Sequence, residues 1–150
     1  MLPAAPLRRA RLLVAGLWAV SVFTVAIGAT VLNAFMSDRA QFGRTVSGLF
    51  KAEAFLALAC VAVIFLLIGA DKTLDHKGKW PLFILTIVGL VGVVGYFYLQ
   101  PMLAALRATV PPGGVMAAEV RQQFGMLHGV SLVLYLMQAV SAVMLVLKNR

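Results

Sequence analysis

The sequence predicts an all-α integral membrane protein, a bundle of four transmembrane helices. Of its 150 residues, 62% are hydrophobic and only 12% are charged, and the mean hydropathy is +0.97. A soluble domain is closer to half apolar. Four apolar stretches are long enough to cross a hydrocarbon layer about 30 Å thick, which takes roughly 20 helical residues. They are Leu12 to Met36, Val46 to Ala70, Trp80 to Leu99 and Met126 to Leu147.

Each of these stretches is predicted to be a helix. Backbone amides cannot remain unpaired in lipid, so a span is either a helix or part of a closed barrel. The apolar runs lack the strict alternation of barrel strands, which favours helices. Four spans leave only short connections, so we expect a single membrane domain over residues 1–150, with no separate soluble domain.

The distribution of positive charge predicts the topology. Of the thirteen Lys and Arg residues, eight fall on the side of both termini and of the Asp71 to Lys79 loop, and five fall on the other side. By the positive-inside rule, both termini and the Asp71 to Lys79 loop are expected to face the cytoplasm. The net charge of +8 is spread over every connecting segment, without interleaved aromatic residues, so it does not predict nucleic-acid binding.

The first span follows Arg8, Arg9 and Arg11 and could be mistaken for a secretory signal. An apolar stretch from Leu12 to Met36 is longer than the roughly 7 to 15 residues of a signal core, so we expect it to remain as a span. Within it, Trp18, Ser21, Thr24 and Gly28 recur at helical spacing. Small and weakly polar residues on one face predict packing against another helix.

The second span carries an acidic residue, Glu53, in its first turns. Its short side chain lies too deep to reach the headgroups, so it needs a hydrogen bond, a cation or a proton. In the third span Gly89, Gly92 and Gly95 predict a groove that admits a neighbouring helix, within one bundle or between two copies. Pro101 is expected to end or kink this helix before Arg107.

The fourth span has a polar stripe. His128, Ser131, Tyr135 and Gln138 recur at intervals of three and four residues, so they share one helical face. Lipid offers their polar atoms no partner, and this face is therefore expected to point toward the other helices.

Five polar residues are expected near the outer boundary of the bundle: Asn33, Glu53, Gln100, Arg107 and His128. One interpretation is an interhelical network in which His128 and Glu53 satisfy each other while Arg107 caps a helix or meets phosphate headgroups. The other is a site that binds a small ligand or relays protons. Either task needs a group that changes its protonation state near neutral pH, and a histidine beside a carboxylate is such a group.

A metal site is a further possibility that the residues leave open. Thioethers and imidazole suit Cu(I), and several methionines flank the same outer ends as His128; they are Met36, Met102, Met116 and Met126. Haem held by two histidines would need a second one near His128, and His76 is predicted on the opposite side. We therefore assign no cofactor. The chain also lacks nucleophile triads and phosphate-binding loops, which favours a non-enzymatic protein.

Several short motifs resemble those of the bacterial transmembrane protein 205-like family, over about Leu12 to Leu147. In the first half they are Leu17-Trp18-Ala19-Val20-Ser21, Asp38-Arg39-Ala40, Gly43-Arg44, Gly48-Leu49-Phe50 and Glu53-Ala54. In the second half they are Pro101-Met102, Leu106-Arg107, Phe124-Gly125 and Leu127-His128-Gly129-Val130-Ser131. A proline expected near the end of the first span is replaced around Ala29-Thr30.

This resemblance implies a four-helix membrane domain, not a particular activity. The fold also looks similar to copper-resistance membrane domains and to a membrane-bound protoporphyrinogen oxidase, which implies metal or tetrapyrrole handling as an alternative. We therefore expect an accessory or transport-related membrane protein with a polar site near the outer face. Its partners would be membrane lipid and either further copies or another membrane protein.

Overall fold

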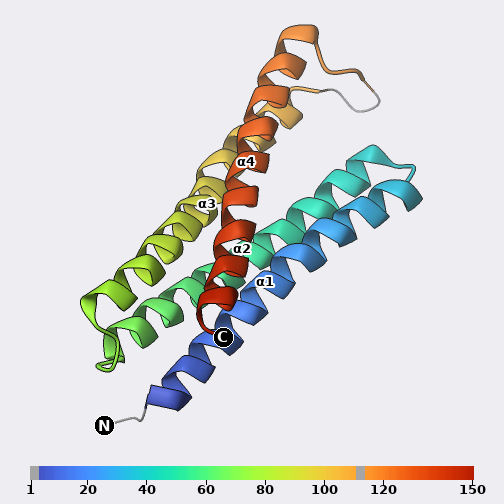
Figure 1. The fold of residues 1–150 in the computed structure, drawn as a ribbon. Helices are drawn as coiled ribbons and strands as arrows, with labels where there is room; N and C mark the ends of the chain where they lie inside the picture. The colour runs from blue at the N-terminus through green and yellow to red at the C-terminus, as the bar shows by residue number, and fades with distance from the viewer. Residues whose placement is uncertain (1–3, 111–113) are drawn as a thin grey trace.

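The computed structural model describes residues 4–110 and 114–150, and all regular secondary structure in these ranges is helical. The four helices are α1 (Ala4–Phe35), α2 (Arg39–Ala70), α3 (His76–Ala108) and α4 (Ala118–Lys148). All four are long and apolar enough to cross a membrane. The predicted fold class, an all-α four-helix membrane bundle, is confirmed (Figure 1).

The helices extend beyond the predicted spans. Each has 31 to 33 residues, which corresponds to about 48 Å at 1.5 Å per residue, more than the thickness of the hydrocarbon layer. Helix α2 begins seven residues before Val46, since the backbone N–H of Gln41 donates to the Asp38 carboxylate at 3.0 Å and so caps the helix.

Pro101 does not end α3, which continues to Ala108. Of the two expected effects of Pro101, an end of the helix or a kink, the first is therefore wrong. In a membrane helix, neighbouring helices compensate for the one backbone bond that proline removes, so the chain can stay helical through it. As a result Arg107 lies on the last turn of α3 and not on a separate segment.

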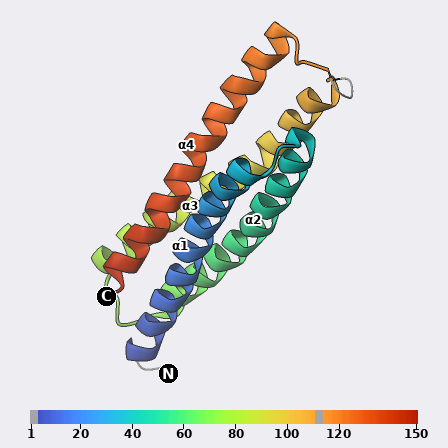
Figure 2. The same cartoon turned by 90° about the vertical axis from the view of Figure 1, so that its right-hand side faces the viewer.

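The helices pack in a ring in chain order. Helices α1 and α2 form one antiparallel hairpin and α3 and α4 form another, and α2 contacts α3 while α4 contacts α1 (Figure 2). Many large apolar side chains point away from the bundle on all four helices. Such an exterior is suited to lipid and not to water.

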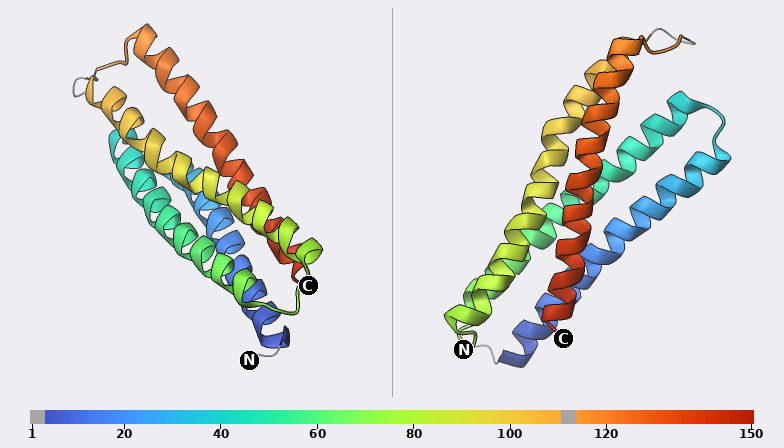
Figure 3. Two further views of the ribbon diagram at one scale, coloured as in Figure 1. Left: turned by 90° about the vertical axis from the view of Figure 1, so that its left-hand side faces the viewer. Right: turned by 45° about the horizontal axis from the view of Figure 1, so that its top comes forward.

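The two ends of the bundle differ. We call the end with the start of α1, the end of α4 and the loop 71–75 the packed end. The opposite end, with the connection 36–38, the end of α3 and the start of α4, is the open end (Figure 1). The two hairpins lie close together at the packed end and diverge toward the open end (Figures 1 and 3). The buried apolar core lies in the half of the bundle nearer the packed end.

Trp18 is the largest fully buried side chain of this core. It reaches across the bundle from α1 to Gly89 of α3, and an added Cβ on Gly89 would overlap its ring. The absence of a side chain at Gly89 is therefore what admits the indole. Closer to the packed end, Ile64 and Ile68 of α2 and Leu145 of α4 belong to the same core.

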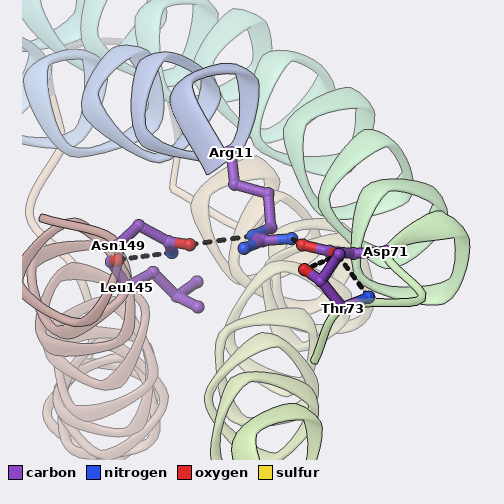
Figure 4. Close-up of polar contacts among 5 residues, drawn as sticks. All are labelled: Arg11, Asp71, Thr73, Leu145 and Asn149. Atoms are coloured by element: carbon purple, nitrogen blue, oxygen red, sulfur yellow. Dashed lines mark hydrogen bonds and ion pairs between the residues drawn. The ribbon is translucent and has the colours of Figure 1, made fainter. Parts of the chain in front are cut away.

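A buried ion pair joins three segments at the packed end (Figure 4). The Arg11 guanidinium donates to the Asp71 carboxylate at 2.7 Å and to the side-chain oxygen of Asn149 at 2.8 Å. Asp71 also accepts from the hydroxyl and the backbone N–H of Thr73. The side chains of Arg11 and Asp71 are only 3% and 2% exposed. This network ties α1, the α2–α3 loop and the end of α4 together.

The hydrogen bonds also determine the charge state of Asp71. Burial alone would raise the pKa of its carboxyl, but the hydrogen bonds from Thr73 and Arg11 outweigh burial and lower the pKa from 3.8 to about 2. Asp71 is therefore a carboxylate at neutral pH, opposite the guanidinium of Arg11. In the sequence alone, Arg11 and the Asp71 to Lys79 loop are recognisable only as topology signals.

Candidate functional site

A cavity of about 680 Å³ lies between the two hairpins in the open half of the bundle, and all four helices line it. Its apolar wall includes Phe42, Val46, Phe50, Leu103 and Leu134. Polar side chains are distributed over the same surface; they are Thr30, Asn33, Ser47, Glu53, Tyr96, Gln100, Arg107, His128, Ser131, Tyr135 and Gln138. The volume is that of a pocket for a small organic molecule.

The structure brings all five residues of the predicted polar cluster to this cavity. Asn33 comes from α1, Glu53 from α2, Gln100 and Arg107 from α3, and His128 from α4. They do not form one compact group, however. Arg107 and His128 lie at the rim toward the open end, whereas Glu53 lies deeper, at the floor.

The partner of Glu53 differs from the one that the sequence suggested. The Gln138 side-chain amide donates to the Glu53 carboxyl at 2.5 Å, so the interpretation in which Glu53 and His128 satisfy each other was wrong. Ten residues separate His128 from Gln138 on α4, or about 15 Å along the helix, which places the imidazole at a different depth. Glu53 and Gln138 are 4% and 2% exposed.

The floor of the cavity is also aromatic. The ring of Phe50, one turn before Glu53 on α2, meets the ring of Tyr135 edge to face with centroids 5.1 Å apart. The Tyr135 hydroxyl donates to the backbone carbonyl of Val22 at 2.6 Å, and the Tyr96 hydroxyl donates to that of Ser47 at 3.4 Å. These bonds fix both tyrosine rings against the carboxyl-bearing floor.

The rim carries positive charge on an aromatic platform. The ring of Phe124 lies parallel to the imidazole of His128, with centroids 6.0 Å apart and an interplanar angle of 8°. The guanidinium of Arg107 lies over the same Phe124 ring at 5.2 Å from its centroid, a cation–π arrangement. Arg107 and His128 are both exposed at the open end, where they can meet water or lipid headgroups.

The three glycines of α3 face α4 and the core. Gly92 approaches the Leu134 carbonyl so closely that an added Cβ would lie 2.6 Å from the oxygen, and at Gly95 a Cβ would overlap the Leu134 side chain. Gly89 faces Trp18, as described above. The small residues of α3 thus bring α4 close enough for Gln138 to reach Glu53 across the bundle.

The polar stripe of α4 runs from the rim to the floor. His128 is exposed, Ser131 and Tyr135 are half-buried, and Gln138 is buried. All four residues line the cavity. The stripe therefore faces the space between the hairpins for most of its length, and only its deepest residue is enclosed by packing.

Candidate metal ligands are sparse in the part of the chain that the structure describes. Residues 4–110 and 114–150 contain no group of three or more His, Cys, Asp or Glu side chains placed to hold a metal ion. The methionines near the open end, Met36, Met102, Met116 and Met126, are not among the residues that line the cavity. His76 begins α3 at the packed end, at the other end of the bundle from His128.

Sequence reasoning missed three contributors to the floor: Phe50, Tyr96 and the role of Gln138 as the donor to Glu53. Gln138 was recognisable as the deepest member of a polar stripe, because glutamine within an apolar helix needs a partner. Its partner was not recognisable, since Glu53 lies 85 residues away on the helix diagonally opposite.

The model of one protein family matches residues 12–111, a family described as a domain of unknown function (DUF4149). The chain belongs to this family. The match includes Glu53, Gln100 and Arg107, whereas α4, with His128 and Gln138, lies beyond it. No curated protein and no solved structure gives a match.

Proposed function

We propose that this member of the DUF4149 family is a membrane protein that binds a small molecule in the cavity between its two hairpins, as an accessory or transport-related component. The observation that carries the proposal is the buried carboxyl of Glu53 at the floor of a cavity of about 680 Å³. Ionisable groups within membrane helices are costly and mark ligand or ion sites more often than not.

A purely structural role for these polar residues does not explain why the helices leave a cavity between them. Helices that needed only to pack would close the space between them, as they do around Trp18 in the packed half. In the open half, eleven polar side chains instead surround a cavity. A lined cavity with a few convergent polar groups is the usual form of a small-molecule site.

The proposed location is the bacterial inner membrane, with both termini in the cytoplasm, so that the cavity opens toward the outer side. Its support is the charge count of eight against five. Gln41→Cys and His76→Cys test it, since both positions are exposed at opposite ends and the native Cys60 is buried. An impermeant maleimide added to whole spheroplasts should label position 41 and not 76. The reverse pattern would invert the topology.

The finer family assignment, transmembrane protein 205-like, is supported by the order of the short motifs. It brings with it the alternative function, copper or tetrapyrrole handling, for which the cavity offers the imidazole of His128 at its rim and, at a different depth, the carboxyl of Glu53. Metal analysis and a visible absorption spectrum of the purified protein distinguish this alternative. Bound copper or haem at a stoichiometric level would favour it over an organic ligand.

The binding proposal is tested by filling the cavity. Ser131→Trp places an indole into the cavity, whereas Val130→Trp places the same side chain at a neighbouring position that points outward and is 50% exposed. Both variants and the parent are purified in mild detergent, and native mass spectrometry identifies small molecules that remain bound.

We expect a molecule that accompanies the parent and Val130→Trp but not Ser131→Trp, and addition of that molecule should raise the thermal stability of only the first two proteins. Identical bound molecules and identical stabilisation in all three proteins would contradict the proposal.

A further inference from the structure

We propose that the floor of the cavity is a site for a hydrophobic organic cation, with the Glu53 carboxylate as the counter-ion and aromatic rings around the charge. This inference rests on the proposed function, because it specifies the class of molecule that the same cavity takes. Three features of the floor lead to it: an acidic group without a cationic partner, aromatic rings with their hydroxyls already bonded, and an apolar wall.

The first feature is the acidic group at the floor. Among the side chains that the structure describes, no Lys, Arg or His lies within 4.0 Å of the Glu53 carboxyl, whereas Asp71, at the packed end, is paired with Arg11. Glu53 has the neutral amide of Gln138 as its hydrogen-bond donor instead. A cation brought to a buried carboxyl that has only a neutral donor supplies the charge that stabilises the ionised form of the carboxyl.

The second feature is the ring cluster. Phe50, Tyr96 and Tyr135 line the cavity together with Glu53, and aromatic rings attract cations that have been removed from water. The two tyrosine hydroxyls are already donated to the backbone carbonyls of Val22 and Ser47. The floor therefore offers π surface and a carboxylate while its nearest hydrogen-bond donors are occupied, which suits a cation and disfavours an anion.

The third feature is the size and polarity of the space. A cavity of about 680 Å³ exceeds the needs of a bare metal ion or a proton, and Val46, Leu103 and Leu134 give it an apolar wall. Such a wall fits a cation with an organic body. A hydrophobic cation also partitions into the membrane, and the cavity lies between the two hairpins that span it.

The cationic rim does not oppose this assignment. Arg107 follows Tyr96 by eleven residues, or about 16 Å along α3, so its guanidinium is far from the floor. It also lies over the Phe124 ring. An anionic ligand, by contrast, would have to be held at this rim by Arg107 and His128. The two classes of ligand thus depend on different residues, and this difference makes the inference testable.

The probes are tetraphenylphosphonium and tetraphenylborate, a cation and an anion of matched size and shape. Binding to the full-length protein in neutral detergent micelles is measured by equilibrium dialysis against empty micelles. The variants are Glu53→Gln, which removes the charge at the floor, and Glu119→Gln, which makes the same change at an exposed position outside the cavity. Phe50→Leu removes a ring without removing charge, and Arg107→Gln removes the charge at the rim.

We expect saturable binding of the cation to the parent, to Glu119→Gln and to Arg107→Gln. Glu53→Gln should lose about tenfold or more in affinity, and Phe50→Leu about fivefold. If Glu53→Gln does not fold, Phe50→Leu and Arg107→Gln still decide the question. Cation binding that is unchanged in Phe50→Leu and Glu53→Gln would overturn the inference.

The result also separates the inference from the proposed function. Saturable binding of the anion that is lost in Ser131→Trp and Arg107→Gln, without saturable binding of the cation, would leave the cavity as a ligand site and reject the cationic class. Absence of saturable binding of either probe, together with no difference between Ser131→Trp and Val130→Trp in bound molecules, would reject both.

Discussion

The packed and open halves of this bundle are built from the same four helices, yet their buried acidic groups have different partners and surroundings. At the packed end Arg11 and Asp71 neutralise each other and join three segments of the chain. In the open half Glu53 has a neutral donor, and it lines a cavity. In this bundle the acidic group that has a matched cation lies where the helices close, whereas the acidic group that has only a neutral donor lines a cavity.

The largest expected effect is at the packed end. Arg11→Ala removes the partner of a carboxylate that is 2% exposed, so the free energy of unfolding should fall by about 3–5 kcal/mol. Unfolding in mixed micelles of dodecyl maltoside and SDS measures it. Arg9→Ala removes the same charge two residues away at an exposed position, and its effect should stay within about 0.5 kcal/mol. Equal effects of the two variants would show that the network does not stabilise the packed end.

The next effect compares two glycines. Gly89→Ala brings a Cβ against the buried Trp18 ring and within 3.2 Å of Ser141, so it should cost about 1–3 kcal/mol by overpacking. Gly28→Ala, in the open half of α1, meets nothing within 4 Å. It should be neutral or stabilise by up to about 1 kcal/mol, because alanine favours the helix. A loss of stability in Gly28→Ala as large as in Gly89→Ala would contradict the difference in packing.

Acid should weaken the packed end. Burial raises the pKa of Asp71 in the folded protein, but the hydrogen bonds from Thr73 and Arg11 lower it by more, from 3.8 to about 2. A lowered carboxyl pKa gives stability that is complete above about pH 4 and is lost as the pH falls toward 2. The loss should be about 1–2 kcal/mol. Unfolding of the parent at several pH values, compared with Asp71→Asn, measures it. A parallel pH dependence in both proteins would assign the effect to other groups.

The smallest effect is at the floor of the cavity. Gln138→Ala removes the donor to Glu53, and the free energy of unfolding should fall by only about 1 kcal/mol, since the carboxyl lines a cavity and water can replace the amide. Gln100→Ala, on the cavity wall, serves as the matched control. If Gln138→Ala lowers the free energy of unfolding as much as Arg11→Ala does, the contact at the floor stabilises the fold as strongly as the ion pair at the packed end.

The sequence was sufficient to predict which polar residues gather in the open half of the bundle. Asn33, Glu53, Gln100, Arg107 and His128 were selected because polar groups near apolar helices need partners, and all five line the cavity. Their pairing could not be predicted. Glu53 was assigned to His128 by its approximate height, but depth within a bundle depends on how far each helix extends, and α4 begins eight residues before the predicted span.

The network at the packed end shows a second limit. Arg11, Asp71 and Asn149 lie near the ends of predicted spans, where charged residues are expected at the membrane surface in any case. Local sequence gives no sign that the three are buried together. Their contact depends on the closure of α4 against α1, a contact between residues 138 positions apart.

The sequence by itself determined the environment and the secondary structure. Long apolar runs place the chain in lipid, and in lipid every backbone group must bond within its own segment, so the helices follow from local composition alone. Only the tertiary structure decided where the bundle closes and where it stays open. The rotation and divergence of the helices depend on side-chain packing among distant segments, such as Trp18 against Gly89 and Gln138 against Glu53.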